Sequence, residues 1–274
     1  ARRFDPDVIV SRLGPASVHV SKLVGSRNVV VSDTHTDSNP LRWLVSRATL
    51  PFVDTICRPP GFDLPVAPAR QRPLDFQELA YLHPNYFTPD PSVLAEYGVP
   101  TDEPFFVVRL AGWDAYHDVG HRGLSPAVTQ ELVSFLAEHG VVYVSSEGDL
   151  PPAFENHRLP TPPEAIHQVL YHADLYVGDS GTMASEAAIL GTPAVRTNTM
   201  AGEDDENVFV ELERRYGLIR SFADERRALS EVKRLVTVGA DRDEWRRRRE
   251  RLVEEQVDVT AEMVEVILES AGRA

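Results

Sequence analysis

The chain has 274 residues, of which 42% are hydrophobic and 26% charged, and this length predicts about two compact domains. No window approaches the roughly 20 uninterrupted apolar residues of a membrane-spanning helix, and the first residues lack the apolar segment of a signal peptide. The formal charge of -14 gives no electrostatic support for a general affinity for nucleic acid or anionic membranes. The single Cys57 excludes an internal disulfide and a cysteine-built metal site. We therefore expect a cytoplasmic protein without a transmembrane segment.

The first part of the chain reads as strand, helix, strand. The predicted strands cover 7–10, 28–32 and 54–57, and an amphipathic helix covers 15–24. The proline-rich stretch from Arg58 to Arg72 is predicted to be an irregular connector. Because only three strand candidates precede this connector and the chain opens without an initiating Met, we expect further strands ahead of Ala1. The first domain is thus expected to be truncated at its N-terminus.

The second part alternates strands and helices. The predicted strands are 105–110, 141–145, 175–178 and 194–196, and the predicted helices are 91–97, 126–139, 163–172, 182–190, 208–216, 243–255 and 260–270. This alternation is typical of a parallel α/β sheet, whose strands all end at one edge, where ligands bind. We expect an incomplete N-terminal Rossmann-like domain over 1–80, a nucleotide-binding Rossmann-like domain over 81–258 and a terminal helix over 259–274.

One strand-to-helix junction has the chemistry of an anion site. Ser180 is a favourable N-cap, and Gly181 and Thr182 are small enough for a ligand to approach the backbone. The N–H groups and positive dipole end of such a helix attract anions such as a diphosphate. Glu186 lies about one turn further along, where a carboxylate can accept hydrogen bonds from sugar hydroxyls. Taken alone, the cap chemistry fits a structural role equally well.

Segment 179–193 resembles the nucleotide-binding motif of UDP-N-acetylglucosamine 2-epimerases and GT-B glycosyltransferases. Leu79–Pro84 together with 109–123 is similar to a largely archaeal family, the domain of unknown function 354. The resemblance implies a GT-B-like α/β fold, in which two Rossmann-like parallel-sheet domains face a cleft and the last helix crosses back to the first domain.

The same resemblance implies roles for individual residues. It puts Ser180 and Gly181 near the diphosphate and Glu186 on the ribose hydroxyls of a UDP-like moiety, and Thr182 beside them is counted with the nucleotide-binding residues. The chain departs from the epimerases in two places: Thr182 replaces a second glycine, and their His-Arg-Arg-Glu-Asn segment has no counterpart. These departures favour glycosyl transfer over 2-epimerisation.

The segment 109–123 is too long and too glycine-broken for a regular helix, and it should leave the carboxyl end of a strand. Arg109 or Arg122 could hold phosphate oxygens, and His117 could act as general acid or base. The alternative is that the histidines only cap a helix or bond the loop backbone. A metal site has no regular scaffold there, so we expect none.

The segment after the second strand offers candidate catalytic groups from the first domain. The epimerases place a catalytic carboxylate after the corresponding strand, which makes Asp33 the nearest match, with His35 beside it. Neighbouring carboxylates in a cleft can divide acid and base roles. The alternative is that these are ordinary turn and capping residues.

The sequence thus predicts a GT-B-type glycosyltransferase that binds a nucleotide sugar, with UDP as the nucleotide, and transfers the sugar to an unidentified acceptor. No cofactor is expected, because the helix N-terminus at Ser180 and an arginine can neutralise the leaving diphosphate. A sugar epimerase and a non-catalytic nucleotide-binding or scaffold protein stay open as alternatives. A homodimer is compatible with the sequence, and nucleic acid is not an expected partner.

Overall fold

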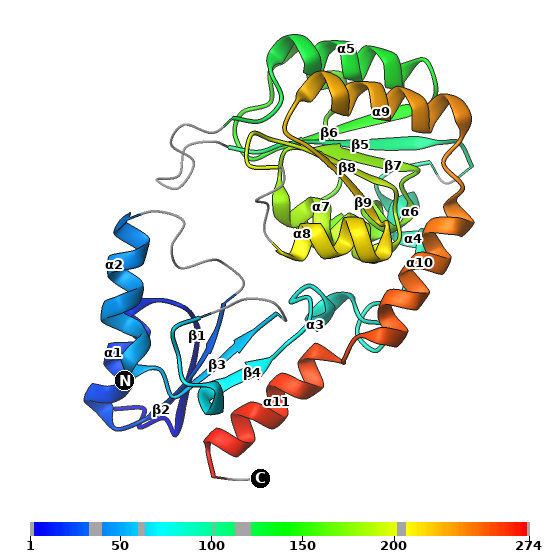
Figure 1. Cartoon of the computed structure of the whole chain (residues 1–274). Coiled ribbons are helices and arrows are strands. Elements are labelled where there is room, and N and C mark those ends of the chain that lie inside the picture. Colours follow the sequence, from blue (N-terminus) through cyan, green and yellow to red (C-terminus); the bar gives the residue numbers. More distant parts are fainter. Residues whose placement is uncertain are drawn as a thin grey trace. The chain divides into compact units, whose positions relative to one another are not determined.

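The computed structural model describes residues 3–32, 40–59, 64–100, 102–112, 122–201 and 207–272. The chain divides into two compact α/β units (Figure 1). The first unit contains Ala1–His83, Glu206–Val208 and Gln256–Ala274, and the second contains Pro84–Asp205 and Phe209–Glu255. Within the described ranges, no helix combines the length and the apolar character needed to cross a lipid bilayer.

The first unit is built on a four-stranded parallel sheet. Its strands, in spatial as well as chain order, are β1 (Val8–Arg12), β2 (Arg27–Val31), β3 (Thr55–Arg58) and β4 (Gln71–Pro73). Helix α1 (Pro15–Val24) packs against β1 and β2 with α2 (Pro40–Thr49) beside it. The opposite face is covered by α11 (Val259–Ser270), which also contacts α3 (Leu79–Leu82) (Figure 1).

The prediction of a connector up to Arg72 was wrong at its end, where the strand β4 begins. This strand pairs in parallel with β3 through Ile56 and Gln71. The side-chain amide of Gln71 accepts a hydrogen bond from Arg58 and donates one of 2.6 Å to the Val66 carbonyl. Three residues are too short to show an alternating pattern, so tertiary pairing and not local sequence defines this strand.

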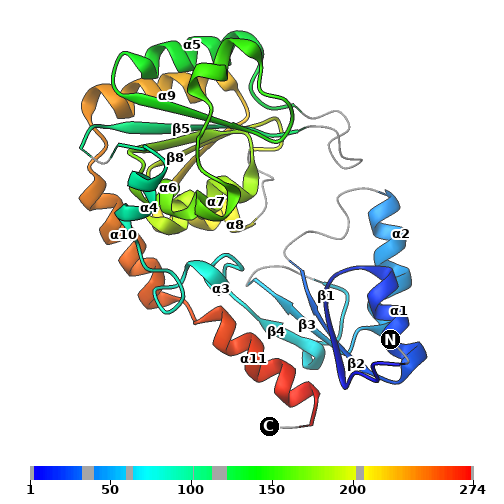
Figure 2. The same ribbon diagram turned by 180° about the vertical axis from the view of Figure 1, so that it is seen from behind.

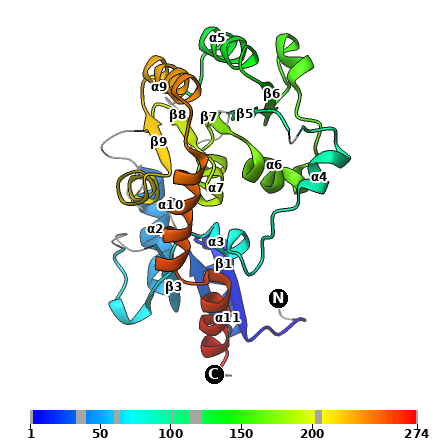
Figure 3. The ribbon, with the colours of Figure 1, turned by 90° about the vertical axis from the view of Figure 1, so that its right-hand side faces the viewer.

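The second unit is built on a five-stranded parallel sheet in the spatial order β6-β5-β7-β8-β9. The strands are β5 (Phe105–Leu110), β6 (Val141–Ser146), β7 (Leu175–Gly178), β8 (Ala194–Thr197) and β9 (Ile219–Phe222). Helices α5 (Pro126–Ala137) and α9 (Glu225–Val238) cover one face, and α6 (Ile166–His172), α7 (Gly181–Leu190) and α8 (Asn207–Glu211) cover the other (Figures 2 and 3). Two further helices, α4 (Pro91–Glu96) and α10 (Arg242–Glu255), pack against α6 and α7 respectively.

Most of the predicted elements of the second unit are confirmed within one or two residues. The strands predicted at 105–110 and 175–178 have these bounds in the structure. The predicted helix 208–216 was wrong in part, because α8 ends at Glu211 and a wider π-helical turn continues to Tyr216.

The elements β9 and α9 were not predicted from the sequence. Helix α9 begins at the N-cap Asp224, whose side chain accepts a hydrogen bond of 2.9 Å from the Arg227 N–H. Its buried side chains include Ala228, Val232 and Leu235, which recur at intervals of four and three residues, and Leu229 beside them. That spacing is the signature of an amphipathic helix and was present in the sequence.

Candidate functional site

The candidate site lies at the carboxyl edge of the five-stranded sheet, where one row of paired residues crosses every strand. In register, this row is Ser145, Arg109, Gly178, Arg196 and Ser221. Residues paired in a parallel sheet point to the same face. The row therefore brings two guanidinium groups to either side of a glycine that has no side chain, next to the point where β7 leads into α7.

Arg109 is largely engaged within the chain. Its side chain is 14% exposed, and its two terminal nitrogens donate to Ser145 Oγ at 2.7 Å and to Glu147 Oε1 at 2.8 Å. Partial burial would raise the pKa of Glu147, but hydrogen bonds from the Gly112 N–H and from Arg109 outweigh it and hold that pKa below its ordinary value. The predicted contact of Arg109 with phosphate stays a prediction, and Arg122 presents an exposed side chain at the same edge.

Tyr176 is a buried polar group that was not singled out from the sequence. The residue has no exposed surface, and its hydroxyl has no hydrogen-bond partner among the described residues. A Cβ atom on Gly178 would lie 2.5 Å from this hydroxyl, so only glycine fits there. Burial, together with the negative charge of Asp179, raises the pKa of Tyr176, which keeps the phenol neutral.

The Asp179 carboxylate forms hydrogen bonds with the backbone on both sides of the segment 113–121. It accepts hydrogen bonds from the N–H of Ala111 at 2.6 Å and from the N–H of Leu124 at 3.1 Å. A Cβ atom on Gly123 would lie 1.8 Å from Asp179 Oδ2. Glycine is therefore required at position 123 for this approach. The carboxylate that precedes the N-cap of α7 thus also positions the chain on either side of the predicted His117 segment.

Asn198 extends the same polar network to the end of β8. Its side-chain nitrogen donates to the Asp179 carbonyl at 3.1 Å, and its side-chain oxygen accepts from the N–H groups of Met200 and Ala201, each at 3.0 Å. The backbone of Thr199 in turn donates to the Arg122 carbonyl at 3.0 Å. The carboxyl ends of β5, β7 and β8 are therefore cross-linked by side chains of one network.

Ser180 caps α7 as predicted. Its backbone is extended, and its hydroxyl accepts from the Met183 N–H at 3.5 Å. Intrahelical bonding begins at Ala184, which donates to the Ser180 carbonyl at 3.3 Å, so the N–H groups of Gly181 and Thr182 point out of the first turn. A Cβ atom on Gly181 would lie 3.1 Å from the ring of Phe209, which gives this glycine a packing role as well.

Glu186 pairs with His167, a residue that the sequence analysis did not single out. His167 Nε2 lies 3.2 Å from Glu186 Oε1, and the two side chains are 28% and 12% exposed. His167 is the second residue of α6, which packs beside α7. No local motif marks this histidine, because the pairing depends on how α6 and α7 pack.

Three predicted catalytic residues, Asp33, His35 and His117, lie outside the described residues. Their roles stay predictions. Within the described part of the chain, no group of three His, Cys, Asp or Glu side chains gathers as a metal-binding cluster.

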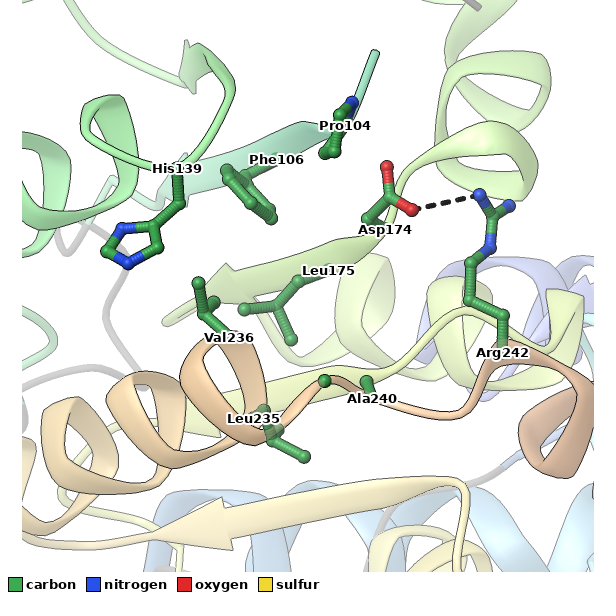
Figure 4. A pocket seen from close by; sticks show the side chains of 10 residues that line it. Pro104, Phe106, His139, Asp174, Leu175, Leu235, Val236, Ala240 and Arg242 are labelled. Carbon is green, nitrogen blue, oxygen red and sulfur yellow. Dashed lines mark hydrogen bonds and ion pairs between the residues drawn. The ribbon is translucent and has the colours of Figure 1, made fainter. Parts of the chain in front are cut away.

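A cavity lies at the amino edge of the same sheet (Figure 4). This cavity of about 230 Å³ is lined mainly by apolar side chains, among them Phe106, Leu175 and Leu235. The charged pair at its side is internally satisfied, because Asp174 accepts from Arg242 at 3.0 Å and from the Phe105 N–H at 3.0 Å. The polar groups of this cavity therefore form hydrogen bonds at the ends of strands and helices.

The whole chain is similar in structure to glycosyltransferases and sugar-nucleotide epimerases. It matches MnaA of S. aureus, solved with UDP, with a TM-score of 0.64 and 12% identity over 100% of this chain and 78% of that one. It matches UDP-GlcNAc 2-epimerase from Methanocaldococcus jannaschii with a TM-score of 0.62 and 13% identity, covering 97% and 78% of the two chains. The match to spinosyn forosaminyltransferase SpnP has a TM-score of 0.57 and 16% identity, with 97% and 78% covered. These similarities confirm the GT-B-like fold.

Sequence comparison leads to proteins without an assigned function. The chain is 30% identical over 112 residues to the uncharacterized protein MJ0665 of Methanocaldococcus jannaschii, a match that covers 40% of this chain and 32% of that relative. The chain thus matches about a third of the length of this curated relative. A family model described as protein of unknown function (DUF354) matches residues 37–269. Because this match spans most of the sequence, the chain belongs to the DUF354 family.

Proposed function

We propose that the chain binds a nucleotide sugar at the carboxyl edge of the five-stranded sheet, with UDP as the nucleotide, and acts as a GT-B-type glycosyltransferase. The start of α7 carries the proposal, because a capped first turn and the carboxylate of Glu186 lie on one ten-residue helix. The outward N–H groups of Gly181 and Thr182 and the helix dipole favour a diphosphate. The carboxylate of Glu186 favours hydroxyl donors such as those of a ribose.

The charges around this helix start support the same assignment. Arg196 is 2% exposed, and its guanidinium lies 3.7 Å from the centre of the Phe209 ring. Arg109 lies on the other side of Gly178 in the cross-strand row. Groups held in place before the reaction stabilise the charge that develops on a departing diphosphate without reorganisation. Arg109 and Arg196 fit this role, because hydrogen bonds and packing hold them in place.

The chemical step in this proposal belongs to residues of the predicted catalytic set. His117 is assigned the role of general acid or base, and Asp33 and His35 are the further candidate catalytic residues. The ends of the segment that carries His117 are bonded to Asp179, the residue before the N-cap of α7. Replacing His117 by alanine is expected to abolish turnover and to leave the affinity for UDP unchanged.

A sugar epimerase is the second candidate function. The TM-score of 0.62 to UDP-GlcNAc 2-epimerase from Methanocaldococcus jannaschii favours it. Thr182 in place of a second glycine and the missing His-Arg-Arg-Glu-Asn segment argue against strict 2-epimerisation. A non-catalytic nucleotide-binding protein would keep the affinity for UDP without turnover.

Isothermal titration with UDP, UDP-N-acetylglucosamine and an ADP-sugar tests the proposal. We expect selective binding of the uridine nucleotides, and Glu186→Ala should weaken it by about 10- to 100-fold, because a charged acceptor is lost. Glu138→Ala removes an exposed carboxylate after α5, near the amino edge of the sheet, and should bind like wild type. A folded chain that binds none of these nucleotides would contradict the proposal.

A further inference from the structure

The pair formed by His167 and Glu186 joins two helices at the candidate site. His167 Nε2 and Glu186 Oε1 are 3.2 Å apart, on α6 and α7 respectively. Glu186 is mostly buried and His167 is partly exposed, with 12% and 28% of their side chains accessible. The pair therefore lies at the boundary between the protein interior and the solvent.

The chemistry of the pair fixes the direction of the contact. An ionised carboxylate only accepts hydrogen bonds, so the hydrogen of this contact belongs to His167 Nε2. The bond restrains the side chain of Glu186, which has three rotatable bonds. Immobilising such a side chain on ligand binding costs up to about 2 kcal/mol of conformational entropy. Because His167 restrains Glu186 before any ligand arrives, that cost is removed from the binding step.

The geometry of α7 defines what the restrained carboxylate can meet. Thr182 and Glu186 are four residues apart and so share one face of the helix. Thr182 is exposed in the first turn, where the outward N–H groups are, and Glu186 follows about 6 Å further along the axis. An anion bound at the first turn and hydroxyl donors bound at Glu186 are close enough to belong to one molecule. A nucleoside diphosphate carries both groups.

We propose that His167 is a positioning residue that holds Glu186 for the ribose diol, and that this pair makes the site select ribonucleotides over 2′-deoxyribonucleotides. The inference rests on the proposed UDP site. A purely structural pair would contribute only to stability, because removing one partner of a mostly buried pair leaves the other unpaired, and it would contribute nothing to the choice between the two sugars. Selectivity for the sugar hydroxyl therefore distinguishes the two roles.

The experiment compares the dissociation constants of UDP and 2′-deoxy-UDP for the full chain and four variants. Wild type is expected to prefer UDP about tenfold or more, the value of a hydrogen bond to a charged group. Glu186→Gln and His167→Ala should each reduce this ratio to about twofold or less. His167→Gln keeps a side-chain N–H donor and should restore part of the preference. His172→Ala, at the other end of α6, should keep the wild-type ratio.

Thermal unfolding of each variant separates loss of folding from loss of selectivity. If His167→Ala lowers the melting temperature but leaves the ratio of the two dissociation constants as in wild type, the positioning role is overturned while the UDP site stands. If wild type binds UDP and 2′-deoxy-UDP equally well, the ribose selectivity is overturned as well. If the folded wild-type chain does not bind UDP, the proposed function fails, and this inference fails with it.

Discussion

The two edges of the five-stranded sheet differ in how they use polar groups. At the carboxyl edge, Asp179 and Glu186 are buried carboxylates with 4% and 9% of their surface exposed. At the amino edge, Phe106, Leu175 and Leu235 line a cavity, and Asp174 completes a strand end and an ion pair. Both edges close the same sheet, so the fold alone does not require the charges at the carboxyl edge.

This difference supports the proposal of a nucleotide site at the carboxyl edge. Burying a charge costs free energy that an apolar residue of similar size would not cost, even when hydrogen bonds compensate part of it. Gly123 and Gly178 admit a carboxylate and a phenol hydroxyl that any larger residue would displace. The two glycines therefore let polar groups gather at the edge where the proposed nucleotide site lies.

The largest expected effect comes from breaking the anchor at the carboxyl edge. Gly123→Ala places a Cβ atom 1.8 Å from Asp179 Oδ2 and should destabilise the protein by about 3 kcal/mol, through overpacking and the loss of a buried hydrogen bond. Chemical denaturation measures this change. Gly148→Ala is the matched control, because its Cβ atom would meet nothing within 4 Å and should change stability by about 0.5 kcal/mol or less. Equal effects of the two substitutions would contradict the anchoring role of Asp179.

The sequence predicted the elements of the second unit because they follow strong periodic patterns. The strand 175–178 is a short apolar run with a glycine at its end, and Ser180 marks the start of the next helix. β4 could not be predicted from the sequence, because Gln71–Pro73 is a strand only through its pairing with β3. α9 could have been predicted from the sequence, since Ala228, Val232 and Leu235 show helical spacing.

The site was predictable only where its chemistry is local. Ser180 and Glu186 lie on one helix, so their spacing is visible in the chain. His167 approaches Glu186 from another helix, and Arg109 approaches Gly178 from another strand. Tyr176 has the sequence pattern of a core aromatic, and only the packing around Gly178 shows that its hydroxyl is buried near charges. Contacts between separate elements depend on tertiary structure, which a single sequence does not encode locally.

A smaller effect is expected for the stability of the protein at acidic pH, to which Glu147 at the carboxyl edge contributes. Glu147 has a pKa below its ordinary value in the folded protein, so its contribution to stability is present above the unfolded pKa and is lost as the pH falls through the folded one. Wild type should therefore lose more stability than Glu147→Gln between about pH 6 and pH 3. Because this side chain is 45% exposed, the difference should stay below about 1 kcal/mol. Denaturation midpoints at several pH values measure it, and parallel pH curves for the two proteins would refute the linkage.

The smallest effect tests the opposite edge. Ala240→Val adds two methyl groups beside the cavity at the amino edge and should stabilise the protein by about 0.5 kcal/mol, because it fills apolar space without touching a charge. Thermal unfolding measures the stability, and titration with UDP measures the binding. The affinity for UDP should not change, because no residue lining this cavity belongs to the carboxyl edge. If Ala240→Val weakened UDP binding as strongly as Glu186→Ala does, the nucleotide would have to bind at or through the amino edge, and the contrast between the two edges would lose its functional meaning.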